Sequence, residues 1–409
     1  MAKDALYTGY APLRHQPVKA VYLLYELLAA FVRVPYWALV AIPPVWRPRR
    51  SWSWARTMVV NIVRRMDIVQ ARAGDFTTPP SYLALVPGKG YHGVWVDPTP
   101  KDYIVGKVAM WAKVSGASPI RLPGYWIHEP NSSIPVQAPH TPGEKVVYAL
   151  HGGAYTRFSA HPSEVPGQAA RGMLEYVESV HRTFSIEYRL SSTAPFAIRH
   201  PFPTALIDAV TGYHYLVATL GIPPADIIVM GDSAGGNLAL ALVRYLVEYQ
   251  IPILPPPGAF LLLSPWADLG TSHETPGSSL ETCATSDFLA PPAAAPRSNF
   301  LHWSIRAFTG PLGLGAAETN AYISPASKHI MDADVPFTNF PRTFISSGGA
   351  EILLDSIRTL YARMERDMGA GNGKVRYLEA EDSVHDLLLI PGLQEPQREE
   401  SRLRRLRSG

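Results

Sequence analysis

The chain shows a regular pattern of hydrophobic and polar positions from about residue 145 onward. Short runs rich in β-branched and aromatic residues are separated by longer runs whose apolar residues recur at helical spacing. The expected strands cover residues 145–150, 182–190, 226–230, 259–263, 342–347 and 374–379, and the main expected helices lie within 166–180, 204–220, 236–249 and 356–368. Nearly continuous apolar strands that alternate with helices predict an α/β fold with a mostly parallel sheet and helices on both faces.

The pattern before this region differs, because residues 21–44 form an apolar run long enough to cross a bilayer. Glu26 and Arg33 lie inside the run, and a charged residue at the centre of a membrane helix costs about 2.5–3.5 kcal/mol. Pro35 would also kink a helix at this point. The run therefore has the length of a membrane span without its usual composition.

Aromatic and basic residues follow the apolar run. Trp46 precedes the sequence RPRR at 47–50, and this combination is typical of a membrane interface. A second amphipathic segment at 57–70 would continue the same structure. Two interpretations stay open: residues 21–50 contact a membrane surface as an anchor or an in-plane helix, or residues 1–110 form a helical cap on a soluble protein.

The remaining chain divides into a core and a tail. We expect a catalytic domain over residues 111–395 and a charged tail over residues 396–409. Residues 270–308 interrupt the strand–helix rhythm with a segment rich in Ser, Thr, Pro and Ala. This segment is either an excursion that shapes a pocket or a surface insertion.

Composition limits the functional classes. With 409 residues, 47% of them hydrophobic, the chain can bury a large core, and its net charge of +3 makes nucleic acid a poor partner. Cys283 is its one cysteine, so no internal disulfide bond forms. The polar, proline-containing first residues lack the form of a secretory signal. We therefore expect an intracellular protein, either associated with a membrane such as the endoplasmic reticulum or soluble in the cytoplasm.

The sequence GDSAGG at 231–236 carries the first candidate chemistry. It follows the expected strand 226–230 and opens an expected helix, as a nucleophile elbow requires. Glycines on both sides of Ser233 permit the tight, strained turn that exposes the serine hydroxyl beyond the strand. A G-x-S-x-G match is a weak signal alone, but in this position it makes Ser233 a candidate nucleophile.

A serine nucleophile needs a base, and the base needs an acid that orients it. His385 lies in a loop just after the last expected strand, which makes it the candidate base. Three other histidines follow Ser233 without sharing this placement: His273, His302 and His329.

The candidate acid follows the strand at 342–347. Glu351 stands where an acid is needed, and Asp355 is its competitor. Asp382 is a weaker alternative, because it is too close in sequence to His385 to reach the far ring nitrogen.

The sequence HGGAY at 151–155 follows the strand at 145–150. Backbone amides without an obstructing side chain can donate hydrogen bonds to an oxyanion, and losing one such donor costs about 2.7–4 kcal/mol. Gly152 and Gly153, with the amide of Ala234 after the nucleophile, are therefore the expected oxyanion hole.

Taken together, these motifs resemble the hormone-sensitive-lipase-like branch of the α/β hydrolases. EYRL at 187–190, HPFPTALID at 200–208 and SPWADL at 264–269 are similar to further blocks of that branch. The apolar N-terminal segment and GGAEILLD look closest to fungal members related to steryl acetyl hydrolases. This chain departs from the usual pattern at Ala154, where a third glycine is common, and at Glu351, where aspartate is commoner.

The resemblance implies a serine carboxylester hydrolase with Ser233 as nucleophile, Glu351 as acid and His385 as base. It implies an apolar ester with a small acyl group as substrate, no metal and no organic cofactor. Tyr155 and Trp266 are candidate substrate-binding residues, although each also fits an ordinary core position. The alternatives are a lactonase or amidase with the same triad, and a non-catalytic ligand-binding receptor. Oligomeric state is not indicated.

Overall fold

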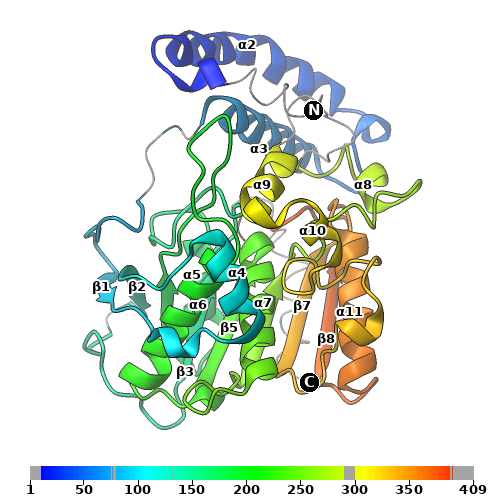
Figure 1. Cartoon of the computed structure of the whole chain (residues 1–409). Helices are drawn as coiled ribbons and strands as arrows, with labels where there is room; N and C mark the ends of the chain where they lie inside the picture. Colours follow the sequence, from blue (N-terminus) through cyan, green and yellow to red (C-terminus); the bar gives the residue numbers. More distant parts are fainter. Residues whose placement is uncertain are drawn as a thin grey trace.

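One central sheet organises the computed structural model, which describes residues 11–74, 76, 80–130, 132–289, 300–386 and 389. Within these residues the sheet has eight strands in the order β1-β2-β4-β3-β5-β6-β7-β8. The strands are β1 His92–Val96, β2 Leu122–His128, β3 Lys145–Leu150, β4 Val180–Ile186, β5 Ile227–Asp232, β6 Ala259–Leu263, β7 Arg342–Gly348 and β8 Val375–Ala380. β2 pairs antiparallel with β1 and β4, and the other pairs are parallel. The predicted mostly parallel α/β sheet is confirmed (Figure 1).

Sequence analysis missed the two antiparallel strands at one side of the sheet. β1 contains Gly93, and β2 contains Pro123 and Gly124, which weaken a strand pattern. A Cβ at Gly124 would lie 2.5 Å from the ring of Phe184, so close packing requires this glycine. β1 lies within residues 1–110, for which the sequence predicted a helical segment.

Helices cover both faces of the sheet. Their bounds are α4 Gly106–Ser115, α5 Gly167–Tyr176, α6 Thr204–His214, α7 Ser233–Tyr249, α8 Ser279–Thr282, α9 Phe300–Thr309, α10 Gly315–Thr319 and α11 Leu354–Met368. A π-helical turn extends α6, and 3₁₀ turns lie at Ala11–Arg14, Pro44–Trp46, Lys101–Tyr103, Pro224–Asp226, Gly310–Leu312 and Asp332–Asp334. Val146 and Tyr148 of β3 join the cluster that includes α6 and α7, whereas Val147 and Ala149 join Ala170 of α5. Alternate residues of β3 thus pack on opposite faces.

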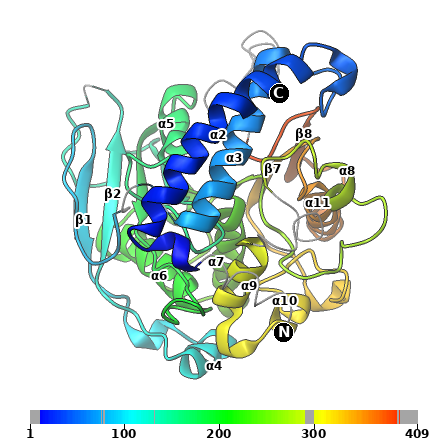
Figure 2. The same cartoon turned by 90° about the horizontal axis from the view of Figure 1, so that it is seen from above.

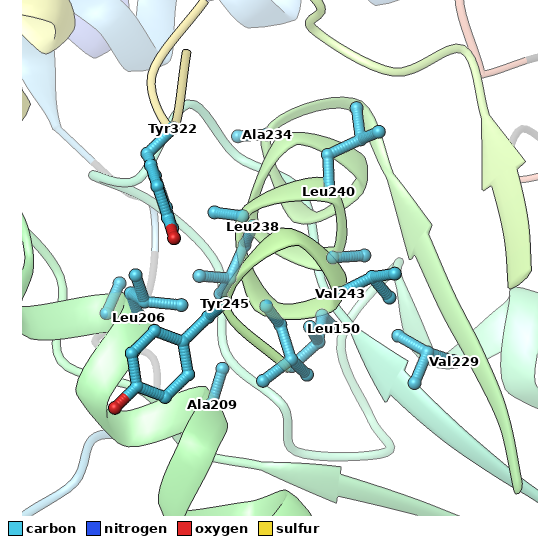
Figure 3. Close-up of a cluster of buried hydrophobic side chains, with 14 of the residues drawn as sticks. Leu150, Leu206, Ala209, Val229, Ala234, Leu238, Leu240, Val243, Tyr245 and Tyr322 are labelled. Carbon is cyan, nitrogen blue, oxygen red and sulfur yellow. The ribbon is translucent and has the colours of Figure 1, made fainter. Parts of the chain in front are cut away.

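α7 lies inside the larger of these clusters. Every residue from Ala234 to Leu246 is buried, as expected for a helix that is apolar on all sides. Figure 3 shows α7 packed between Leu150 and Val229 of the sheet and Leu206 of α6. The helix that begins at Ser233 is therefore fixed in the core.

The N-terminal residues form an additional layer. α2 Val18–Val40 runs through Pro35 without ending there, and α3 Trp54–Ala73 packs along it. α3 lies between α2 and the rest of the molecule, and α2 is the outermost element (Figures 1 and 2). Residues 290–299 of the predicted excursion and the predicted tail 396–409 lie outside the described residues.

A buried ion pair fixes the chain after β4 to α6. Nη2 of Arg189 lies 2.7 Å from Oδ1 of Asp208, and the Arg189 backbone amide donates to Oδ2 at 2.9 Å. The Asp208 side chain is 0% exposed. Arg189 of the EYRL sequence and Asp208 of the HPFPTALID sequence therefore have a structural role, because they join the chain after β4 to α6.

Asp208→Ala should destabilise the fold strongly, because it leaves the Arg189 guanidinium buried without its counter-charge. We expect the free energy of unfolding to fall by about 3–5 kcal/mol in urea denaturation. The control is Asp97→Ala, which breaks the pair of Arg121 with Asp97, where the side chains are 60% and 85% exposed. That change should cost less than about 1 kcal/mol. Equal losses of unfolding free energy in Asp208→Ala and Asp97→Ala would contradict a stabilising role for the buried ion pair.

Candidate active site

The turn between β5 and α7 holds Ser233 in an unusual backbone conformation. β5 ends at Asp232 and α7 begins at Ser233, whose φ of +50° lies in the left-handed region. A Cβ at Gly231 would lie 2.2 Å from the carbonyl oxygen of Gly235, and one at Gly235 would lie 2.0 Å from that of Leu150. Both positions therefore require glycine, and Ser233 is presented at the carboxyl end of β5.

Glu351 and His385 come from the loops that follow β7 and β8. Both are buried, with exposures of 0% and 2%. Nδ1 of His385 lies 3.1 Å from Oε2 of Glu351. The carboxylate can therefore hold the Nδ1 proton and orient the ring.

The other candidate acids have different partners. Oδ2 of Asp355 in α11 accepts a hydrogen bond of 2.7 Å from the amide of Ser279. Asp382 accepts a hydrogen bond from the hydroxyl of Ser51. Of these three candidates, only Glu351 contacts the imidazole of His385 in the described structure.

Ser233 and His385 line one cavity of about 300 Å³. Its other walls are largely apolar and come from distant parts of the chain: Val63 and Met66 of α3, Phe158, Trp266, Phe288 and Phe300. The structure thus brings the predicted nucleophile and base to one site. The N-terminal layer and the segment around residues 270–308 both contribute to its walls.

The second ring nitrogen of His385 faces a carboxylate that sequence analysis did not single out. Oδ2 of Asp386 lies 3.1 Å from Nε2, and the Asp386 amide donates to Oγ of Ser264 at 3.3 Å. Within the described residues, no hydrogen bond joins Nε2 to the Ser233 hydroxyl. A side chain adjacent to His385 in sequence reaches its ring here because Asp386 adopts a φ of +49°.

Four carboxyl groups lie close enough to interact electrostatically with the imidazole, and three of them are buried. Burial lowers the pKa of His385, but the charges of Asp386 and Glu351 outweigh this effect and raise it well above its ordinary value. Burial raises the pKa of Asp287 to about 7, and burial with the charge of Asp386 raises the pKa of Asp232. The charges of Asp386 and Glu351 therefore favour the imidazolium form of His385. Among the described residues, no three His, Cys, Asp or Glu side chains are arranged to hold a metal ion.

The structure changes the expected set of oxyanion donors. The amide of Gly152 donates to Oδ2 of Asp232 at 3.0 Å, and Gly152 does not line the cavity. Gly153 and Ala154 do line it, and neither amide takes part in a hydrogen bond within the described residues. This corrects the expectation for Gly152, whose amide is already bonded. Ala234 is the second residue of α7, where helix amides lack partners within the helix.

Tyr155 is a core residue, which corrects its expected place in the pocket. Its side chain is fully buried, its hydroxyl donates to Oδ1 of Asn237 at 2.6 Å, and its ring stacks on Phe308 with centroids 3.7 Å apart. Tyr155 therefore braces the loop after β3 against α7. Trp266, the other candidate, does line the cavity.

An ion pair that sequence analysis missed joins the N-terminal layer to the loop after β3. Nη2 of Arg157 lies 2.6 Å from Oδ1 of Asp67 in α3, and both residues line the cavity. The guanidinium also lies 3.9 Å from the ring centroid of Phe300. No sequence pattern links these residues, since their meeting depends on where α3 packs.

Known proteins resemble the part of the chain that carries this site. A family model described as the alpha/beta hydrolase fold matches residues 146–389. An esterase from Acinetobacter venetianus is 35% identical over 159 residues, which cover 38% of this chain and 45% of that protein. Steryl acetyl hydrolase 1 from Saccharomyces cerevisiae is 36% identical over 73 residues, or 18% of this chain and 16% of that protein. The chain spans less than two thirds of the length of the curated relatives it matches.

The fold also matches solved structures. A crystal structure of an esterase from the bacterial hormone-sensitive lipase family aligns with a TM-score of 0.52 and 22% identity. The alignment covers 87% of this chain and 99% of that chain. At this identity the likeness concerns the fold alone.

Asp386→Asn tests the electrostatic control of His385. Removing the negative charge beside Nε2 should lower the pKa of His385, because that charge stabilises the imidazolium. An NMR titration of the imidazole signals measures this pKa, and the His385 signal is assigned by its loss in His385→Gln. Glu381→Gln removes an exposed charge from the same loop and should leave the pKa unchanged. If the pKa of His385 is the same in Asp386→Asn and wild type, the contact between Asp386 and Nε2 of His385 is refuted.

Proposed function

The chain belongs to the alpha/beta hydrolase fold family, and we propose that it is a serine carboxylester hydrolase of the hormone-sensitive-lipase-like branch. The observation that carries the proposal is the convergence of Ser233, His385 and Glu351 from three separate turns beside one apolar cavity. Relatives named as an esterase and a steryl acetyl hydrolase support ester hydrolysis.

In the proposed reaction, Oγ of Ser233 attacks the ester carbonyl carbon while Nε2 of His385 takes the hydroxyl proton. Glu351 holds the Nδ1 proton and stabilises the imidazolium. The tetrahedral intermediate collapses as the carbon–oxygen bond breaks, and His385 gives its proton to the departing alcohol. A water molecule deprotonated by His385 then attacks the acyl-serine, which releases the acid and restores the serine.

The negative oxygen of the tetrahedral intermediate needs fixed donors. We assign this role to the amides of Gly153, Ala154 and Ala234, because the first two residues line the cavity with amides unbonded within the described residues and the third follows the nucleophile. Asp232 supports the arrangement by holding the amide of Gly152. Each donor of this kind typically contributes about 2.7–4 kcal/mol to transition-state stabilisation.

The contact between Asp386 and Nε2 must open before catalysis, since the same nitrogen has to accept the serine proton. The base must also be neutral, and its raised pKa means that the neutral imidazole becomes abundant only at higher pH. The rate is therefore expected to rise with pH through the pKa of His385.

The proposed substrate is an apolar ester with a small acyl group. The cavity of about 300 Å³ is at the small end of the usual range for ligand pockets, roughly 300–1,000 Å³, and its lining is mainly apolar. A lactonase or an amidase would use the same catalytic residues. Rates on substrates with different leaving groups therefore distinguish these alternatives from an esterase.

We also propose that the enzyme meets an intracellular membrane surface, such as the endoplasmic reticulum, through residues 21–50. α2 is long and apolar enough to cross a membrane, judged by length and composition alone. Cell fractionation separates this proposal from a soluble cytoplasmic enzyme. Because α3 lines the cavity, we treat residues 1–110 and the catalytic residues 111–395 as one functional unit.

Ser233→Ala should lower the turnover of p-nitrophenyl acetate by about 10⁴-fold or more, because no other group can form the acyl-enzyme. Release of p-nitrophenol measures the rate. Ser163→Ala changes an exposed serine that does not line the cavity and should retain wild-type turnover. Equal turnover in wild type and Ser233→Ala would refute the serine mechanism, and no turnover in wild type would favour a ligand-binding receptor.

A series of p-nitrophenyl esters with lengthening acyl chains tests the small-acyl proposal. We expect kcat/KM to be highest for short acyl chains and to fall for long ones, which a cavity of about 300 Å³ does not accommodate. A short-chain lactone and p-nitroacetanilide measure the lactonase and amidase alternatives. A maximum at long chains would show that the cavity opens beyond its present volume.

A further inference from the structure

The outermost helix presents an apolar face to solvent. α2 lies above α3, on the side away from the sheet (Figures 1 and 2). Large apolar side chains that are more than half exposed recur along it at helical spacing, including Leu24, Leu28, Phe31, Val32 and Leu39. Phe31 is 73% exposed and Val32 is 74% exposed. An exposed apolar face of this length marks an interaction surface.

The opposite side of α2 is tied to α3 by charged groups. Oε2 of Glu26 accepts hydrogen bonds from Nε of Arg65 in α3 at 2.9 Å and from Nη1 of Arg33 at 2.6 Å. Glu26 is only 8% exposed. The polar residues that interrupt the apolar run therefore lie between the two helices and leave the outer face apolar.

The C-terminal end of α2 is also fastened to the following loop and to the start of α3. The guanidinium of Arg47 donates to the carbonyl oxygens of Ala41 at 2.8 Å and Trp52 at 2.6 Å. Nε1 of Trp54 donates to the carbonyl of Ala38 at 2.8 Å. α2 is thus held along α3 at its middle and at its end.

The N-terminal layer as a whole carries an excess of positive charge. Residues 11–66 contain nine Lys and Arg residues, whereas Glu26 is the sole acidic residue among them and is bound by two arginines. Trp46, which is 65% exposed, extends the apolar face next to Arg49 and Arg50. Positive charge beside exposed aromatic and aliphatic side chains complements an anionic lipid surface.

These contacts oppose a helix that crosses the bilayer. A spanning α2 would have to leave Arg65 behind and carry Glu26 into hydrocarbon without that partner. A helix that lies on the membrane keeps both ion pairs inside the protein and places only its apolar face in the lipid. The arrangement matches an amphipathic helix in the interface plane.

We infer that α2 lies flat in the plane of an anionic membrane, with its apolar face in the boundary between headgroups and acyl chains. The membrane orientation of α2 does not depend on the proposed esterase activity. Only its consequence for catalysis, the delivery of an ester from the membrane, rests on the proposed function. Val63 and Met66 of α3 line the cavity, so in this orientation α2 and α3 lie between the lipid and the cavity. A membrane-dissolved ester then has a short path to Ser233.

Vesicle sedimentation tests the surface. The full chain should bind vesicles of phosphatidylcholine mixed with phosphatidylserine, and bind phosphatidylcholine alone less well. Leu28→Asp with Phe31→Asp should reduce binding at least tenfold. Met331→Asp is the matched control, because Met331 is 72% exposed but lies far along the chain near α11, and it should bind like wild type. Equal binding by the α2 double variant and wild type would overturn the inference.

Cysteine labelling tests the orientation. In a Cys283→Ser background, single cysteines at Val18 and Ile42 mark the two ends of the helix, which are 43% and 60% exposed. A membrane-impermeant maleimide added to sealed vesicles carrying the protein should reach both ends from the side of the catalytic domain. Labelling of the two ends from opposite sides would show a spanning helix and overturn the inference.

The activity of the same variants separates this inference from the proposed function. The Leu28→Asp, Phe31→Asp variant should hydrolyse soluble p-nitrophenyl acetate at the wild-type rate and lose activity on an acetyl ester embedded in anionic vesicles. Retained activity on the embedded ester would refute lipid-side delivery. Absence of activity on both esters in wild type would instead count against ester hydrolysis and leave the docking measurements valid.

Discussion

The close packing of the turn between β5 and α7 constrains the rest of the molecule. Gly231 and Gly235 leave no space for a Cβ, and α7 is buried on every side from Ala234 to Leu246. The turn therefore cannot relax without disturbing the core cluster. A left-handed Ser233 is stable here because the surrounding packing over-determines its backbone. The loops after β3, β7 and β8 then assemble around a fixed hydroxyl.

Electrostatics shape the site as much as sterics do. Glu351 orients His385 through Nδ1, and the carboxylate of Asp386 lies beside Nε2 of the same ring. The charges of Asp386 and Glu351 raise the pKa of His385 and stabilise the imidazolium that forms during proton transfer. The same raised pKa lowers the fraction of neutral imidazole that can act as a base at low pH.

The N-terminal layer connects the membrane-facing surface with the chemistry. Glu26 ties α2 to α3 through Arg65, and Asp67 ties α3 to the loop after β3 through Arg157. That loop carries the amides of Gly153 and Ala154. Two separate ion pairs on α3 thus connect it to the outer helix and to the loop that carries the proposed oxyanion donors, and α3 also forms a wall of the cavity.

The sequence by itself determined the class of fold, the six parallel strands of the sheet, and the positions of Ser233, Glu351 and His385, because strand–turn–helix order and glycine spacing are local properties. It missed β1 and β2, where glycine and proline weaken the strand pattern but neighbouring strands supply the hydrogen bonds. Only the tertiary structure decided which amides face the cavity, since that depends on the bond of Gly152 to Asp232. The tertiary structure also revealed the contacts of Asp386 with His385 and Ser264 and the contact of Glu26 in α2 with Arg65 in α3. No local sequence pattern predicts these contacts, because they depend on how the loops and helices pack.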